Sequence, residues 1–214
     1  MKQAPFWIKR GDNMLQRWLG NQLRQPRGLF SKWIGNYMQK GNLTINRWTT
    51  EVMDLKGKAV ILEIGIGNGA TLHEIVKTVD IGSATGIDIS NEMLKQARKR
   101  NLKYIEQGLM ELRYGDVMDL PFEDIIFDKV FSIHTIYFWI DLNRSFSEIH
   151  RVLKPGGKVY ISITDRAQME KMQRTNSFTL LDVTEIENLL QRNHFTSVKR
   201  HSNGVFWCLE ATKG

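Results

Sequence analysis

The fold is decided by residues 59–70, which read Ala59-Val60-Ile61-Leu62-Glu63-Ile64-Gly65-Ile66-Gly67-Asn68-Gly69-Ala70. A continuous apolar run that ends in glycines is typical of a strand buried on both faces of a parallel sheet. The glycines let the backbone turn sharply and leave no side chain between it and a ligand. Residues 71–79 can form a helix whose free N–H groups face this loop. The stretch therefore predicts a strand, a loop and a helix that together bind a nucleotide-type cofactor.

The glycine loop by itself leaves two cofactor classes open. Residues 65–70 also satisfy the G-x-G-x-x-A pattern of a dinucleotide site, and Asp88 lies 18 residues past Ala70, close to the ~20 expected of a ribose-binding acid. Three features favour another cofactor. Glu63 stands inside the strand end, where an acid is costly without a partner. Asp116 follows the third expected strand. The chain then finishes with a helix and a hairpin instead of a second mononucleotide half, so a nicotinamide dehydrogenase is a distant alternative.

Strands and helices alternate along the chain. Strands are expected over 59–64, 84–89, 109–114, 127–133 and 158–163, and helices over 71–79, 91–103 and 141–153. Ser90 can cap the second of these helices. Pro155-Gly156-Gly157 should end the third, because proline cannot continue a helix and glycine takes the terminal turn. Residues 165–182 carry little pattern and are interpreted as a loop or mobile insertion.

The last third of the chain predicts one more helix and a hairpin. Thr184 can cap a helix that reaches about Arg192, with Glu187 completing a capping box. Asn203-Gly204 separates the apolar segments 195–201 and 205–211, which is a strong hairpin signal. The whole order predicts a doubly wound α/β fold with a mostly parallel seven-stranded sheet and a C-terminal antiparallel hairpin.

The N-terminal segment differs from the rest of the chain in charge and composition. Residues 1–50 contain nine Lys or Arg and one acid, whereas the whole chain has a net charge of +7. Apolar residues at helical spacing predict a helix from Leu29 that Gly41 would stop. We expect two parts, an N-terminal helical cap or lid over 1–50 and a cofactor-binding domain over 51–214. A basic face beside an aromatic face also suits peripheral contact with an anionic membrane or with a nucleic-acid backbone.

Composition excludes several classes of protein. The single cysteine, Cys208, excludes an internal disulfide and a cysteine-rich zinc site, so no metal is expected. It lies in an apolar run and is interpreted as a buried core thiol, which fits a reducing cytoplasm. No stretch approaches the ~20 apolar residues of a transmembrane helix, and the N-terminus lacks the apolar region of a secretory signal. The oligomeric state expected is a monomer or homodimer.

Five motifs in order resemble the class I S-adenosylmethionine-dependent methyltransferases, type 11, a branch that includes quinone-ring C-methyltransferases. Residues 63–69 are similar to the first motif of that family, and Gly86-Ile87-Asp88 to its second-strand acid. The later motifs are matched by residues 115–122, by Phe127-Asp128-Lys129-Val130 and by residues 151–157. The resemblance covers about residues 57–163, and the expected hairpin fits the family topology.

The resemblance implies S-adenosylmethionine as the cofactor and assigns roles to residues that could bind it. Gly65, Gly67 and Gly69 would let the loop approach its methionine part, and Glu63 would lie near the ammonium group. Asp88 would accept hydrogen bonds from both ribose hydroxyls, as the two oxygens of a carboxylate can. The remaining implied cofactor contacts are Asn68, Ile89, Met93, Gly115, Asp116, Val117, Ser132 and Ile133; among these, Ile89 or Met93 would pack on adenine, and Asp116 and the Val117 N–H would meet its polar edge.

The methyl acceptor is expected near residues 132–139, where the family places it. His134 is the best candidate for a base, because its ordinary pKa of ~6.5 suits proton transfer; a histidine that only positions cofactor or backbone is the favoured interpretation. Tyr137 could orient an acceptor oxygen, and Phe138 and Trp139 could form an aromatic wall. The Asp/Asn-Pro-Pro-Tyr/Phe signature of amino-group methyltransferases is missing. We therefore expect a small-molecule acceptor, with a nucleic-acid target or a membrane lipid such as a quinone as alternatives.

Overall fold

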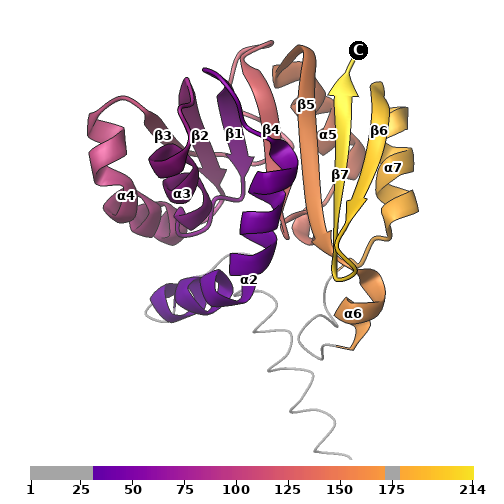
Figure 1. Cartoon of the computed structure of the whole chain (residues 1–214), viewed down its shortest axis with the longest axis horizontal. Helices are drawn as coiled ribbons and strands as arrows, with labels where there is room; N and C mark the ends of the chain where they lie inside the picture. The colour runs from indigo at the N-terminus through magenta and orange to yellow at the C-terminus, as the bar shows by residue number, and fades with distance from the viewer. Residues whose placement is uncertain (1–30, 172–178) are drawn as a thin grey trace, which may run out of the picture.

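The computed structural model describes residues 31–171 and 179–214, with side chains from residue 42 onward. One sheet of seven strands runs through it in the order β3-β2-β1-β4-β5-β7-β6 (Figure 1). The strands are β1 (Val60–Ile64), β2 (Ser83–Asp88), β3 (Met110–Tyr114), β4 (Phe127–Ile133), β5 (Leu153–Thr164), β6 (Phe195–Ser202) and β7 (Phe206–Lys213). Among the described strands, β7 runs antiparallel to both of its neighbours, β5 and β6, and the other strand pairs are parallel. The predicted mostly parallel sheet with a terminal hairpin is confirmed.

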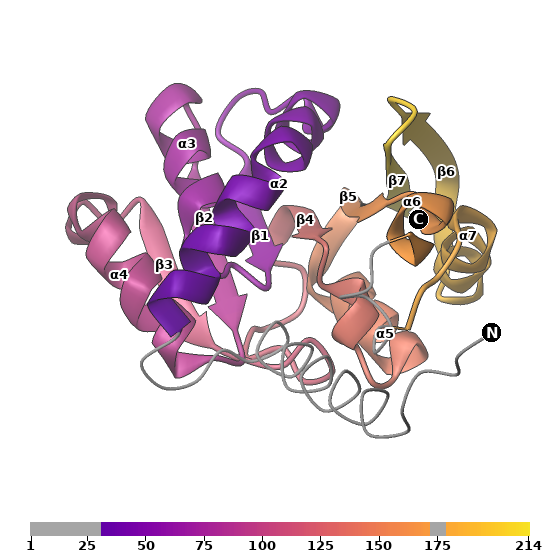
Figure 2. The ribbon, with the colours of Figure 1, turned by 90° about the horizontal axis from the view of Figure 1, so that it is seen from below.

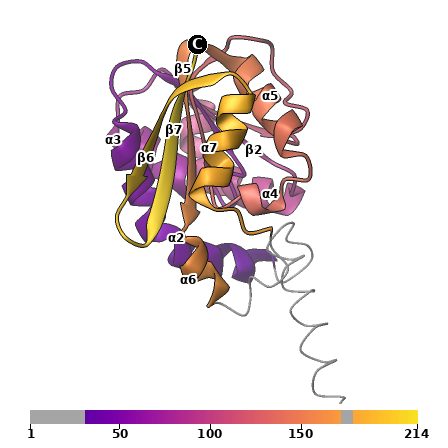
Figure 3. The same ribbon diagram turned by 90° about the vertical axis from the view of Figure 1, so that its right-hand side faces the viewer.

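Helices cover both faces of the sheet. They are α2 (Ser31–Met53), α3 (Ala70–Thr78), α4 (Asn91–Glu106), α5 (Leu142–Val152), α6 (Arg166–Glu170) and α7 (Val183–Arg192), with a 3-10 turn η2 (Ile136–Phe138). One core cluster contains buried residues of α2, α3 and α4, and the other contains those of α5 and α7. Figure 3 shows α5 and α7 on the side of the sheet opposite α3. Side chains are therefore packed on both faces of the sheet, which explains why β1 is apolar at every position except Glu63.

The carboxyl edge of the parallel strands carries α2 and the loops that follow β1, β2, β3 and β4. Figure 2, seen from below, shows α2 passing across the ends of β1 and β2. Ile45 and Met53 of α2 are buried in the core cluster that also contains Ile61 of β1. The prediction that Gly41 stops this helix is wrong, since the helix continues for three more turns and passes the expected boundary at residue 50. Packing of its later apolar residues outweighs the local cost of one glycine.

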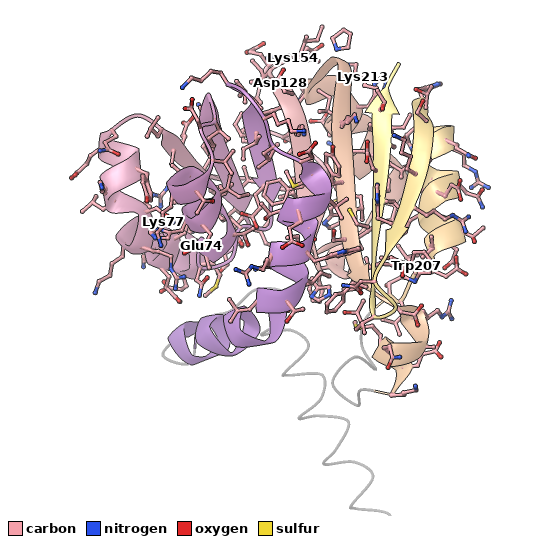
Figure 4. All side chains as sticks on the ribbon, in the orientation of Figure 1. Glu74, Lys77, Asp128, Lys154, Trp207 and Lys213 are labelled. Carbon is pink, nitrogen blue, oxygen red and sulfur yellow. The ribbon has the colours of Figure 1, made fainter. Side chains whose placement is uncertain are left out.

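The opposite edge is tied together by an ion pair at the start of β4. Asp128 accepts a hydrogen bond from the Val60 N–H at 2.8 Å and an ion-pair contact from Lys154 at 2.9 Å. Figure 4 shows Asp128 and Lys154 at this edge and Trp207 near the other. The indole of Trp207 donates to Asp165, which joins the end of β5 to the hairpin at 3.0 Å. The carboxylate of Asp128 therefore joins β4 to β1 and β5 and has a structural role.

Three further expectations about elements need correction. The helix α5 ends at Val152, just before the Pro-Gly-Gly turn, as expected, but the strand starts earlier than residue 158: β5 begins at Leu153 and contains the turn, with an irregularity in its pairing with β4. Part of the expected 165–182 loop is the short helix α6, which Asp165 caps; residues 172–178 lie outside the described chain. The last helix is capped by Asp182, whose capping-box partner is Glu185, two residues before the predicted pair.

Candidate active site

The backbone of the glycine loop forms one wall of a pocket at the carboxyl edge. The N–H groups of Gly65 and Ile66 both donate to the Ile87 carbonyl at 2.9 Å, which fastens the loop to the end of β2. A Cβ on Gly65 would lie 2.3 Å from Cγ2 of Thr135, so only glycine fits there. Gly67 has a φ of +55° and no atom within 4 Å of its Cβ position. The loop thus presents bare backbone to the pocket, as predicted.

Asp88 ends β2 and is held by the loop that it faces. Its two carboxylate oxygens accept hydrogen bonds from the Gly67 N–H at 2.9 Å and the Ser90 N–H at 2.8 Å. Burial raises the pKa of Asp88 to about 6, against the lowering effect of these donors. A carboxylate oxygen has two lone pairs, so each oxygen can accept a further donor from a ligand in the pocket.

Glu63 is the most unusual group of the pocket. Its side chain is 3% exposed, and desolvation raises its pKa well above the ordinary value. The Thr71 hydroxyl and the Leu72 N–H donate to it and partly oppose that rise, whereas the nearby Asp88 adds to it. Within the described part of the chain, Oε2 of Glu63 is a buried oxygen that has no hydrogen-bond partner. Such an oxygen costs stability unless a ligand brings a donor, and a cationic donor suits it best.

The third side of the pocket follows β3. Asp116 accepts a hydrogen bond from the Met118 N–H at 2.9 Å, which shapes the turn. Gly115, Val117 and Met118 line the pocket with it, and so do Ile89 and Met93 of α4. An apolar slot with a carboxylate at its edge is suited to a flat heterocycle that carries an amino group.

The fourth side comes from the segment after β4 and from α2. The lining residues there are Asn42, Asn46, Ile133, His134, Thr135, Phe138, Trp139 and Ile140. His134 has a φ of +58°, a conformation that L residues adopt at some cost. Its ring nitrogens contact Oδ1 of Asn42 at 3.1 Å and Oγ1 of Thr164 at 2.8 Å. The imidazole therefore connects α2 to the end of β5 at the pocket wall.

The structure brings most of the predicted site residues together and sets three apart. Those that line the pocket are Glu63, Gly65, Gly67, Asn68, Asp88, Ile89, Met93, Gly115, Asp116, Val117, Ile133 and His134. Ser132 is buried beside the Thr135 hydroxyl. Tyr137 lies in the core, where its hydroxyl accepts from the Thr164 N–H at 3.1 Å and burial raises its pKa. Gly69 caps α3 and packs against α4.

Sequence reasoning missed Asn42 and Asn46, which enter the pocket only because α2 crosses the carboxyl edge. It also missed Thr71, the second residue of α3, whose hydroxyl donates to Glu63. The described residues contain no group of three His, Cys, Asp or Glu that could hold a metal ion. No helix in the described part of the chain is long and apolar enough to span a membrane.

The residues present fit the cofactor that the sequence resemblance implies. The unpartnered oxygen of Glu63 would receive the ammonium group of S-adenosylmethionine, and Asp88 would receive the ribose hydroxyls. The slot between Met93 and Val117 would hold adenine, with Asp116 at its amino group. The bare backbone at Gly67 leaves room for the methionine part. The fit rests above all on the buried oxygen of Glu63, which needs a donor that the described chain does not provide.

Comparisons with known proteins identify the family of the chain. A family model described as a methyltransferase domain matches residues 62–161. The chain is 39% identical over 171 residues to "Putative methyltransferase YrhH" of Bacillus subtilis, across 79% of this chain and 87% of that one.

Solved structures share the fold. A chain of the Haloferax volcanii complex between the Trm112 methyltransferase activator and its methyltransferase superimposes with a TM-score of 0.72 and 20% identity, covering 87% of this chain and 98% of that one. Phosphoethanolamine N-methyltransferase 2 of Haemonchus contortus, solved with S-adenosylmethionine, gives 0.69 and 20%, covering 79% and 52%. The chain therefore belongs to the class I S-adenosylmethionine-dependent methyltransferases of type 11, and S-adenosylmethionine is its cofactor.

Proposed function

We propose that this methyltransferase acts on a small-molecule acceptor that binds between the segment 138–140 and helix α2. The observation that supports this most is the continuity of one pocket from the glycine loop to Phe138, Trp139 and Ile140. An acceptor held against that wall would lie next to the cofactor's methionine part. Pockets of this kind, apolar with a few polar groups, suit small molecules. The name of the Haemonchus enzyme, a phosphoethanolamine methyltransferase, also refers to a small acceptor.

The protein's contribution to the reaction is mainly alignment. S-Adenosylmethionine supplies an activated methyl group on a sulfonium when it is bound. The chain's own residues hold that group and the acceptor in line and exclude water, which can supply ~7–11 kcal/mol of the barrier reduction. The Phe138–Ile140 wall would exclude water on the acceptor side, and Asn42 and Asn46 would offer amide groups to a polar acceptor atom.

We assign His134 a positioning role, the interpretation that the sequence favoured over a role as the base. Both of its ring nitrogens contact protein oxygens, those of Asn42 and Thr164. A base in this position would have to exchange one of those contacts for the acceptor proton. Tyr137 is proposed to shape the wall from behind, since its hydroxyl is bonded to the backbone of β5.

The experiment supplies the purified protein with methyl-tritiated cofactor and a cytosolic extract, and then separates small molecules, nucleic acid, protein and lipid. Label in the small-molecule fraction that disappears with Asp88→Ala supports the proposal. Label confined to nucleic acid, protein or lipid refutes it. Asp88→Ala is the matched control because it removes a cofactor contact and no group on the acceptor side.

A second candidate function rests on the charge of residues 1–50. Nine Lys or Arg against one acid would attract a nucleic-acid backbone or an anionic membrane. We propose this segment as a cap of the cytoplasmic enzyme, with recruitment to RNA as the alternative. Residues 1–30 lie outside the described chain, so the test is biochemical. Steeply salt-dependent RNA binding that is lost on deleting residues 1–30 would favour recruitment, and unchanged binding would exclude it.

A further inference from the structure

A fully buried asparagine lies on the apolar face of α4. Asn101 is 0% exposed and follows Leu94 and Ala97 at helical spacing, where an apolar residue would be expected. Its backbone leaves the helical region, with φ −108° and ψ 15°, although the helix continues beyond it. A buried amide costs stability unless all of its groups find partners. The partners of Asn101 therefore indicate why it is there.

All the hydrogen-bonding groups of the Asn101 amide are used. Nδ2 donates to the carbonyl of Gly69 at 3.1 Å and to that of Ala97 at 3.0 Å, and Oδ1 meets Nδ1 of His73 at 2.9 Å. Because two carbonyls fix which end of the amide is the donor, His73 must carry its proton on Nδ1. The backbone N–H of His73 donates to the same Gly69 carbonyl at 3.2 Å. Gly69, His73 and Asn101 thus form a closed ring of hydrogen bonds.

The ring holds the point where the glycine loop becomes α3. The residues on either side of Gly69, Asn68 and Ala70, line the cofactor pocket, whereas Asn101 does not. Gly69 has a φ of +75°, and a Cβ there would lie 2.5 Å from Nδ2 of Asn101. The loop and α4 are therefore complementary, with the missing side chain of Gly69 leaving room for the amide of Asn101.

We propose that Asn101, oriented by His73, is a positioning residue for the cofactor. Its amide fixes the Gly69 carbonyl and so holds the glycine loop in its binding conformation before the cofactor arrives. A loop with three glycines loses much conformational freedom on ordering, and a loop that is ordered in advance does not lose it again on binding. The proposal depends on the cofactor site and is independent of the identity of the methyl acceptor.

The test measures dissociation constants for S-adenosylmethionine and S-adenosylhomocysteine by calorimetry. Asn101→Asp keeps the shape of the side chain, but its carboxylate cannot donate to the Gly69 carbonyl. We expect about tenfold weaker binding of both ligands, equivalent to ~1.4 kcal/mol. His73→Ala removes only the contact that orients the amide, so its effect should be smaller than that of Asn101→Asp.

The matched control is Ile186→Ala in α7, which is 0% exposed and packs in the other core cluster. It should lower the melting temperature and leave both dissociation constants unchanged when measured well below that temperature. If Asn101→Asp behaves in the same way, Asn101 is only a structural residue and the proposal is wrong. A larger loss of affinity for His73→Ala than for Asn101→Asp would also overturn it.

Discussion

Lowering the pH through the pKa of Asp88 should weaken cofactor binding by a calculable amount. Burial raises that pKa from 3.8 to about 6, so ionisation is disfavoured in the folded, ligand-free chain. At about 1.36 kcal/mol per pH unit, the rise corresponds to roughly 3 kcal/mol. The pKa of Asp88 is higher in the folded chain than in the unfolded chain. These roughly 3 kcal/mol therefore stabilise the fold fully below pH ~4 and are lost as the pH rises through 6. A ligand that donates to the ionised carboxylate recovers part of the loss.

The ionised fraction of Asp88 at each pH also determines how much the dissociation constant of the ligand changes with pH. At pH 7 nearly all Asp88 is ionised and ready to accept the ribose hydroxyls, whereas at pH 5 about one molecule in ten is. If the bound ligand keeps the pKa below 5, the dissociation constant should rise about tenfold between pH 7 and pH 5. The sign follows from the ribose hydroxyls, which donate to the ionised carboxylate and so lower its pKa in the complex; binding is then weaker as the pH falls.

The assay uses 5′-methylthioadenosine, which has the nucleoside of the cofactor and lacks its amino-acid part. This ligand leaves Glu63 without a cation, so calorimetry at several pH values reports on Asp88 separately. Asp88→Asn should bind the ligand more weakly and show no slope, because the titrating group is gone. A wild-type dissociation constant that is flat from pH 7 to pH 5, or a slope that persists in Asp88→Asn, would refute the reasoning.

Three other changes probe separate parts of the account. Glu63→Gln should weaken S-adenosylmethionine binding ~10- to 150-fold, which corresponds to a hydrogen bond to a charged group, and should leave 5′-methylthioadenosine binding unchanged. Equal losses of affinity for the two ligands in calorimetry would contradict the ammonium contact. Gly65→Ala should abolish cofactor binding, because the new Cβ would collide with Thr135. Gly108 has a similar φ and no neighbour within 4 Å, so Gly108→Ala should only lower the free energy of unfolding in urea by ~1–2 kcal/mol. Equal losses of cofactor affinity in the two variants would refute the steric reason. Burial raises the pKa of the Cys208 thiol to about 12, so Ellman's reagent should modify it only after unfolding, and rapid reaction of the native chain would contradict its burial.

The elements that were predicted best are those whose first and last residues are determined by the local sequence. The strand β4 was predicted at residues 127–133 and has those limits in the structure. Ser90 caps α4 as expected, because a hydroxyl before a helix can bond the free N–H groups without tertiary help. The end of α4 was placed three residues too early, at a position where no residue stops the helix.

The errors arose where contacts between residues far apart in the sequence, or on different elements, determine the structure. Two capping boxes overlap near the start of α7, and Asp182 prevails because Leu181 and Ile186 on either side of it are both buried, as in a hydrophobic staple. Tyr137 lies in a continuous apolar run, residues 136–140, which does not reveal the direction of its hydroxyl; that hydroxyl accepts a hydrogen bond from the Thr164 N–H of β5. Asn101 could have been found, since a polar residue on an otherwise apolar helix face indicates a buried network.

A crystal structure of the protein with S-adenosylhomocysteine tests the central claim most directly. The account predicts the ligand's ammonium group against Oε2 of Glu63, the ribose hydroxyls on Asp88 and adenine between Met93 and Val117. The sulfur that carries the methyl group in the cofactor should face Phe138 and the segment up to residue 140. A ligand bound elsewhere, or one that leaves the buried oxygen of Glu63 without a donor, would contradict the account.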